Sequence, residues 1–406
     1  MNVVFLNPSY PPEMVEFTRG LTEVGATVLG VGDSPAESLD PRLKGYLSHY
    51  LQVPRLLDED DLVERVTRWL AGKPIDRVES TWEPLVVAAA RLRENLGCPG
   101  MSVDTVNGFR DKEIMKARVA AAGLRVPRSA GCKSAEHVRK AAAQIGYPLI
   151  VKPIAGAGSA DTYRVDSPQR LEEVIGLTGH VAEVSVEEFI EGEEFTFDCI
   201  CVDGQPVFAN VAQYIPKPLQ QRTHEWISPI IITVRDMYGD KYRAGVELGL
   251  GVLKAMGMGD GFTHMEWFLK PDGEVVFGEI GCRPGGARLV DQMNLTCDVD
   301  LFREWARAVC WKSFEAPTDR KYNVAIIFKR AQGEGHITAR HGLAEYMSKY
   351  HAAICAEELL PVGARRRNWK NTLVSDGYIL VRHPDWDAAL GLAKAAATDI
   401  TLTASR

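Results

Sequence analysis

The chain has 406 residues, of which 46% are apolar and 25% charged, and it carries a formal net charge of -7 at pH 7. These fractions are those of a soluble globular protein, and the length predicts two to three domains rather than one core. The negative charge gives no electrostatic reason to expect a nucleic acid or an anionic membrane as a partner.

The sequence shows neither the pattern of an export signal nor the run of about 18 apolar residues that a membrane span needs. The eight cysteines occur singly, without a CxxC pair, so we expect neither a zinc site nor a disulfide framework. Such cysteine usage is typical of a reducing compartment. We therefore expect a cytoplasmic protein.

The N-terminal part of the chain alternates between strand-like and helix-like segments. The expected strands lie at residues 2–6, 26–31 and 78–80, and the expected helices run to about residue 23 and over about 60–71 and 84–96. Such alternation predicts a small parallel sheet with helices on its faces, which we place at residues 1–107.

The central part mixes helix and strand signals. Asp111 can cap a helix that Gly123 ends, and Ser134 and Ser167 can start two more. Strand patterns are expected at 148–152, 162–165 and within 184–214, a polar stretch follows at 216–228, and helices are expected at about 242–256 and 300–311. The pattern of residues 316–406 predicts a smaller unit of strands and helices, with an amphipathic segment at 385–397 near its end.

Two glutamates, Glu266 and Glu279, lie on either side of the run Pro271-Asp272-Gly273-Glu274. The Asp-Gly pair predicts a two-residue hairpin turn in which Pro271 faces Glu274, and this register makes the two glutamates face each other. Like charges about 5 Å apart across a ladder are destabilising, so a cation between them would explain the pair. Carboxylates favour Mg²⁺ or Mn²⁺, with phosphate and water as the other ligands. The alternative is a solvated glutamate pair in a slipped register.

Lys152 ends an apolar strand and is followed by Gly156 and Gly158. An ammonium group beside a glycine-rich loop can hold phosphate oxygens, because glycines let backbone N–H groups approach the anion. The spacing is that of neither a P-loop nor a GxGxxG turn, and a structural lysine before an ordinary turn is the alternative.

Taken in chain order, five blocks resemble the ATP-grasp ligases. These blocks are Asp111-Lys112, residues 147–153 with the glycine loop 156–159, and residues 186–196, 261–266 and 279–286. The resemblance implies a multidomain protein of α/β and α+β class with an ATP-grasp fold at 108–315, whose smaller nucleotide lobe spans about 113–190. The parallel α/β domain would precede this fold, and a C-terminal α+β unit at 316–406 would follow it.

The resemblance also implies which residues contact ATP and metal. The expected ATP contacts are Lys112, Lys152, Gly156, Gly158, Ser159, Glu187, Glu188, Phe189, Ile190 and Glu194. Within this set, an acidic residue and backbone groups at 187–190 would meet the adenine edge, and Glu194 would accept from the ribose. Glu266 and Glu279 would hold Mg²⁺ or Mn²⁺, although Gly281 stands where many members carry asparagine.

The reacting groups are expected in the block that follows the second glutamate. Arg283, Gly285 and Gly286 would stabilise charge on an acyl phosphate. His264 and Arg288 are candidate substrate contacts, and the alternatives are a packed histidine and an arginine that braces the next helix.

The Glu-x-x-x-Arg-Pro-Gly-Gly form resembles the branch that ligates amino acids. We therefore expect an ADP-forming carboxylate–amine ligase that uses ATP and Mg²⁺, takes a small-molecule carboxylate, such as an amino acid, and an amine as substrates, and works through an acyl phosphate. The expectation allows a homodimer. Two alternatives remain open, a carboxylating or purine-pathway enzyme of the same superfamily and a regulatory ATP-binding protein without turnover.

Overall fold

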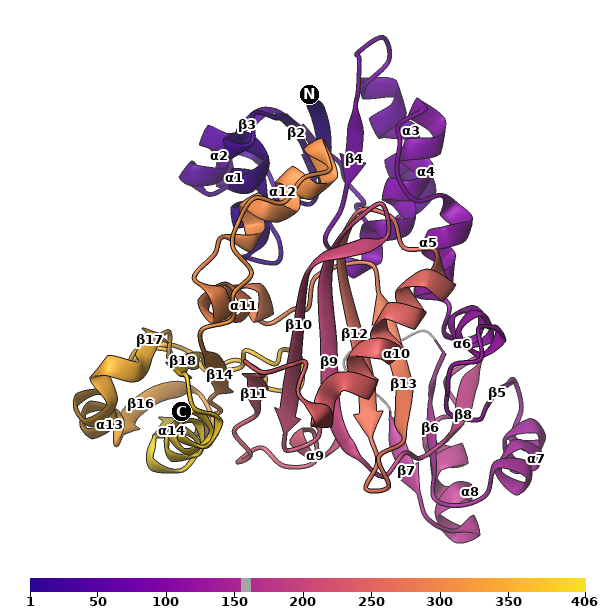
Figure 1. The fold of residues 1–406 in the computed structure, drawn as a ribbon, viewed down its shortest axis with the longest axis vertical. Coiled ribbons are helices and arrows are strands. Elements are labelled where there is room, and N and C mark those ends of the chain that lie inside the picture. The colour runs from indigo at the N-terminus through magenta and orange to yellow at the C-terminus, as the bar shows by residue number, and fades with distance from the viewer. Residues whose placement is uncertain (155–161) are drawn as a thin grey trace.

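The computed structural model describes residues 1–154 and 162–406, and the strands of these residues form four sheets (Figure 1). Among the described residues, no helix combines the length and the apolar character that a membrane crossing would need. All eight cysteines lie in the described part and carry free thiols. The predicted loop contacts Gly156, Gly158 and Ser159 lie outside the described residues.

The N-terminal unit is the predicted parallel sheet with helices on its faces. Its elements are β1 (Asn2–Leu6), α1 (Met14–Glu23), β2 (Thr27–Gly32), α2 (Pro41–Tyr46), β3 (Leu47–Gln52), α3 (Glu59–Trp69), β4 (Arg77–Glu79) and α4 (Val86–Leu96). The strand order is β3-β2-β1-β4, with every pair parallel. Sequence patterns predicted neither α2 nor β3. Strand β3 lies at the edge of the sheet, and its side chains are partly or fully exposed, so they form no apolar run.

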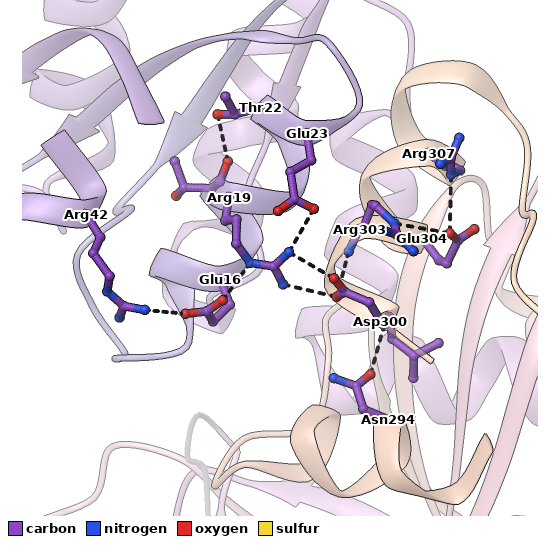
Figure 2. A network of polar contacts seen from close by, with 12 residues as sticks. Glu16, Arg19, Thr22, Glu23, Arg42, Asn294, Asp300, Arg303, Glu304 and Arg307 are labelled. Atoms are coloured by element: carbon purple, nitrogen blue, oxygen red, sulfur yellow. Dashed lines mark hydrogen bonds and ion pairs between the residues drawn. The ribbon is translucent and has the colours of Figure 1, made fainter. Parts of the chain in front are cut away.

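Helix α1 fastens this unit to helix α12 (Leu301–Trp311), which comes much later in the chain. Arg19 on α1 donates hydrogen bonds of 2.9 and 3.1 Å to the two carboxylate oxygens of Asp300, just before α12 (Figure 2). The helices approach closely because Gly20 has no side chain, and a Cβ there would lie 2.4 Å from the carbonyl oxygen of Phe302. The position of α1 is therefore fixed relative to the centre of the molecule.

A small lobe follows, in which helices pack on a four-stranded sheet. Its elements are α5 (Val103–Arg110), α6 (Lys112–Ala121), β5 (Ser129–Cys132), α7 (Ala135–Ile145), β6 (Leu149–Pro153), β7 (Tyr163–Val165), α8 (Pro168–Leu177) and β8 (Val184–Glu188). The strand order is β5-β8-β6-β7. The predicted helix starts are confirmed, since Asp111, Ser134 and Ser167 each accept a hydrogen bond from a backbone N–H of the first turn.

The eight-stranded sheet forms the centre of the molecule, and the small lobe lies beside its β13 edge (Figure 1). Its elements and their neighbours are β9 (Glu193–Val202), β10 (Gln205–Ile215), α9 (Pro218–Gln221), β11 (Ile230–Thr233), α10 (Asp240–Met256), β12 (Gly261–Leu269), β13 (Val275–Gly281), α11 (Leu289–Cys297), β14 (Asn323–Phe328), β17 (Ile354–Glu357) and β18 (Tyr378–His383). The order is β13-β12-β9-β10-β11-β14-β18-β17, and all pairs are antiparallel.

The C-terminal part of the chain extends this sheet, because β14 pairs with β11. The predicted limit between residues 315 and 316 therefore lies within one continuous sheet, and the predicted limit at 107 falls inside α5. The three domain ranges stay predictions. The last elements are β15 (Gln332–Gly333), β16 (His336–His341), α13 (Leu343–Tyr350), α14 (Trp386–Asp399), which is the predicted amphipathic helix, and β19 (Thr401–Ser405).

Candidate active site

Glu266 on β12 and Glu279 on β13 face each other, which confirms the predicted pairing. The predicted two-residue turn, however, is wrong. The amide of Gly273 donates to the carbonyl of Lys270, and the amide of Lys270 donates to the carbonyl of Glu274, both at 2.9 Å, so the loop has three residues. Gly273, at a φ of 87°, supplies the left-handed conformation that such loops need.

A β-bulge restores the predicted register. Next to the turn, Trp267 faces Phe277, which is one residue out of the predicted register. Gly278 is then an extra residue on β13, so that Glu266 faces Glu279 again. The longer loop and the bulge each shift the pairing by one residue, and the two shifts cancel.

We expect Gly278→Ala to destabilise the protein, because a Cβ at Gly278 would lie 2.8 Å from the backbone carbonyl oxygen of Glu266. Overpacking of this kind costs about 1–3 kcal/mol, measured as the free energy of unfolding in urea. Gly176→Ala, at an exposed position of α8 where a Cβ meets nothing within 4 Å, is the control and should cause no loss. Equal stability of the two variants would contradict the importance of the bulge.

The cleft between the small lobe and the β12–β13 edge brings together most of the predicted ATP and metal contacts. Those that line it are Lys112, Lys152, Glu187, Glu188, Phe189, Ile190, Glu194, Glu266 and Glu279. Ile150, Leu219 and Phe268 add apolar walls, so the cleft combines a surface suited to a flat ring with a group of charges. Leu219 belongs to α9, within the polar stretch at 216–228.

The lysines of the cleft are held by carboxylates. The Nζ of Lys112 lies 3.0 Å from Oε2 of Glu279, and the Nζ of Lys152 lies 2.9 Å from Oε2 of Glu187. Glu187 is also bonded by Lys116, whose Nζ lies 2.5 Å from Oε1. Burial opposes ionisation of Glu187, but the charges of the two lysines outweigh it and lower its pKa to about 2.

Sequence reasoning missed Lys116. It follows Lys112 by four residues, which places both on one face of α6, and this spacing was a readable signal. Burial lowers the pKa of Lys116, although Glu187 opposes the shift. Glu188 lies differently from its neighbour, because Arg125 binds its carboxylate at 2.8 Å and Arg128 at 3.3 Å.

Three carboxyl groups, those of Glu194, Glu266 and Glu279, line the same cleft. Burial, and then the charge of Glu266, raise the pKa of Glu194 well above its usual value. Burial also favours the neutral form of Glu266, but hydrogen bonding to His264 outweighs it, and the pKa of Glu266 is lowered. The hydroxyl of Tyr214 donates to Glu266 at 3.1 Å, a contact that the sequence did not reveal.

His264 lies on the same strand face as Glu266, as predicted. Its Nδ1 is 2.5 Å from Oδ1 of Asp198, and its Nε2 is 3.8 Å from Oε1 of Glu266. Burial opposes the charged form, but Asp198 raises the pKa of His264 to about 9, so the ring is cationic at neutral pH. Asp198 was also missed, since it is brought to His264 by pairing of β9 with β12.

Arg283 is anchored by the N-terminal unit. Its Nε lies 2.6 Å from Oε2 of Glu83, and the other oxygen of Glu83 lies 2.6 Å from Arg110. Glu83 was missed because it is 200 residues from Arg283 in sequence. The loop that follows packs on His264, since a Cβ at Gly285 would lie 3.0 Å from its Nδ1.

Arg288 begins α11 in a left-handed conformation, with a φ of 65°. Its Nη1 lies 3.7 Å from Oδ2 of Asp291, which is a longer contact than a hydrogen bond. Arg283, Gly285, Gly286 and Arg288 all line a second cavity, beside residues of the N-terminal unit. The predicted reacting groups therefore lie together, in a cavity distinct from the cleft that holds the predicted ATP contacts.

The family model of the ATP-grasp domain matches residues 145–291. An L-arginine-specific L-amino acid ligase of Bacillus subtilis is 24% identical over 309 residues, which cover 74% of this chain and 73% of that protein. The alanine–anticapsin ligase of the same species is 24% identical over 62% of this chain and 58% of its own length.

The fold matches solved structures over almost the whole chain. The crystal structure of an L-amino acid ligase from Bacillus licheniformis matches with a TM-score of 0.78 at 19% identity, covering 99% of this chain and 98% of that one. An N5-carboxyaminoimidazole ribonucleotide synthetase from Thermotoga maritima gives 0.74 at 17% identity, with 99% of both chains covered.

These matches confirm the predicted multidomain α/β and α+β fold. The chain therefore contains an ATP-grasp domain at residues 145–291, and its sequence and fold are similar to those of L-amino acid ligases.

Proposed function

We propose that the protein is an ATP-dependent, ADP-forming ligase that joins the carboxylate of an amino acid, or of a related acid, to an amine. One observation carries this proposal: Glu266 and Glu279 line the same cleft as Lys112 and Lys152. Arg283 and the Gly285-Gly286 turn line the second cavity. Two sequence relatives, named as an L-amino acid ligase and as an alanine–anticapsin ligase, support the choice of substrates. The free thiols agree with a cytoplasmic location, and the homodimer stays a prediction.

In this proposal Lys112 and Lys152 bind phosphate oxygens, and Glu194 accepts from the ribose. The role of Glu187 differs from the one expected. Its carboxylate is fully engaged by Lys116 and Lys152, so it positions lysines rather than reading the adenine edge. Residues 188–190 and the apolar walls of the cleft are left to contact the base.

Glu266 and Glu279 would hold Mg²⁺ or Mn²⁺. Among the described residues, no group of three or more His, Cys, Asp or Glu side chains is arranged for a metal ion. Two carboxylates nevertheless fit Mg²⁺, which commonly takes its other ligands from phosphate and water. Glu194 and Glu266 line the same cleft, and a cation there would offset the negative charge of their carboxylates. When bound, the ion would neutralise phosphate charge during phosphoryl transfer.

Gly281 has a structural reason to replace the usual asparagine. A Cβ at Gly281 would lie only 3.0 Å from Oε2 of Glu83, the atom that anchors Arg283. A side chain at this position would compete with the Glu83–Arg283 ion pair. We infer that this chain keeps the anchored arginine in place of a third protein ligand for metal.

The reaction proceeds in two transfers. A carboxylate oxygen of the acid attacks the γ-phosphorus of ATP, the bond to the bridging oxygen breaks, and ADP leaves. The amine then attacks the carbonyl carbon of the acyl phosphate, loses a proton, and expels orthophosphate. Arg283, held in place by Glu83, would stabilise the negative oxygens in both steps. The protein itself forms no covalent bond in this scheme.

We expect ATP turnover to require a divalent cation and a carboxylate, to rise with a matching amine, and to move ¹⁸O from a labelled carboxylate into phosphate. Amino acids should be tested in pairs for ADP release, with ³¹P NMR to follow the label. AMP as product would contradict the acyl phosphate route. ADP formation with bicarbonate alone would favour the carboxylating alternative, and no turnover with any pair would favour the regulatory one.

A further inference from the structure

The second cavity is lined by three segments of the chain that are far apart in sequence. The first segment, residues 11–17 at the start of α1, includes Glu13. The second, residues 81–83, follows β4, and the third is residues 283–291. Because Arg283 and the Gly285-Gly286 turn form one wall, the cavity opens directly onto the proposed reaction centre.

Glu13 is a buried carboxylate that lacks a partner. Only 8% of the residue is exposed, and its side chain makes no hydrogen bond or ion pair with any described residue. Burying a carboxylate without a partner is costly, so such groups are normally paired. Relaxation of α1 cannot expose Glu13 easily, since the Arg19–Asp300 contact fixes that helix (Figure 2). The cavity wall therefore presents the Glu13 carboxylate in a fixed position.

Asp291 adds a second carboxylate to the same cavity. Its Oδ2 atom is buried without a hydrogen bond, and the nearest cation is the guanidinium of Arg288 at 3.7 Å. Burial raises the pKa of Asp291 to about 6, with the charge of Glu13 adding to the shift and Arg288 opposing it. The other acidic group, Glu83, is already neutralised by Arg283 and Arg110. Glu13, without a hydrogen-bond partner, and Asp291, with only the long contact to Arg288, thus line one cavity, where a positively charged ligand would stabilise both carboxylates.

We propose that Glu13 and Asp291 bind a protonated nitrogen of the substrate whose carboxylate is activated beside Arg283. This inference rests on the proposed ligase function. A nitrogen held between carboxylates stays protonated, so it cannot be the nucleophile that attacks the acyl phosphate. The site therefore selects the acid that is activated and excludes acids without a charged nitrogen. This nitrogen is the α-ammonium group of an amino acid or the cation of a basic side chain.

Binding measurements test the proposal without turnover. The 406-residue chain, saturated with Mg²⁺ and a non-hydrolysable ATP analogue, is titrated in a calorimeter with two pairs of ligands, alanine against propionate and lysine against norleucine. Alanine has an α-ammonium group that propionate lacks, and lysine has a side-chain ammonium group that norleucine lacks. In at least one pair, we expect the ligand with the additional ammonium group to bind about tenfold or more tightly. If only lysine and norleucine differ in affinity, the bound group is the cation of a basic side chain. If only alanine and propionate differ, the bound group is the α-ammonium. Equal binding within both pairs, or no binding of any amino acid, overturns the proposal.

Two variants assign the discrimination to the cavity. Glu13→Gln and Asp291→Asn should each weaken binding of the ligand with the additional ammonium group about tenfold. The affinity for the other member of the pair and the affinity for the ATP analogue should not change. Glu37→Gln removes an exposed carboxylate from the same unit and should have no effect. A purely structural role for Glu13 predicts a lower unfolding temperature instead, whereas removal of an unpaired buried charge should keep or raise it. Discrimination that survives in both variants overturns the assignment.

The two proposals can fail separately. Discrimination in binding without ADP release from any acid and amine pair would reject the ligase function and retain the cation site. ADP release by variants that still discriminate would retain the ligase function and reject the cation site. In the active enzyme, Glu13→Gln should raise the KM for the acid about tenfold and leave the KM for ATP unchanged.

Discussion

Replacing Glu279 by glutamine is expected to lower the rate of ADP release about 10³-fold or more, while the fold remains intact. Glutamine keeps the shape of the side chain but removes the charge that would hold a divalent cation, and a metal's stabilisation of phosphate charge is worth several kcal/mol. The fold should survive because the substitution relieves the repulsion between Glu279 and Glu266 across the hairpin.

A glutamate on the same hairpin provides the control for this prediction. Glu274 lies at the turn and pairs with Lys270 and Arg125 at the surface, away from the cleft lining. Glu274→Gln should leave turnover within about twofold, because surface ion pairs contribute little. Turnover is measured over a range of Mg²⁺ and Mn²⁺ concentrations, with thermal unfolding as the check on the fold. Full activity of Glu279→Gln at low Mg²⁺ would reject the metal role.

The glutamate pairing shows what short-range sequence signals can and cannot provide. The Asp-Gly run correctly identified two adjacent antiparallel strands, because turn residues act locally. Loop length and the bulge at Gly278 depend on how β12 fits between β9 and β13, which the local sequence does not specify. The facing of Glu266 and Glu279 was right because two shifts cancelled, so the reasoning that led to it was incomplete.

The residues around the cleft and the second cavity divide in the same way. Lys116 could have been found from its spacing to Lys112 on one helix, which is a local pattern. Glu83 and Glu13 could not, because they reach the site only when the N-terminal unit packs on the loop at 283–291. The continuous sheet across residue 315 was likewise not readable, since pairing of β11 with β14 joins segments about 90 residues apart, a separation at which local patterns carry no information.

Lys152→Ala should weaken ATP binding and lower the turnover rate about 10²-fold. Lys152 lines the cleft, and a partly desolvated ammonium beside phosphate interacts far more strongly than a solvated one. Burial opposes its charged form, but Glu187 and then Glu279 outweigh burial and raise the pKa of Lys152, so it is cationic when ATP binds. Lys44→Ala, at an exposed position on α2, is the control and should change neither value.

Comparison with Lys116 separates phosphate binding from support of Glu187. Lys116 contacts the same carboxylate at 2.5 Å but is buried and does not line the cleft. Lys152→Ala leaves Glu187 paired with Lys116, so stability should change little while the Kd for an ATP analogue rises. Lys116→Met removes the more buried partner, so the unfolding temperature should fall by several degrees, with a smaller rise in the Kd. If Lys152→Ala bound ATP normally and only lost stability, Lys152 would be a structural partner of Glu187 and the phosphate contact would have to come from elsewhere in the cleft.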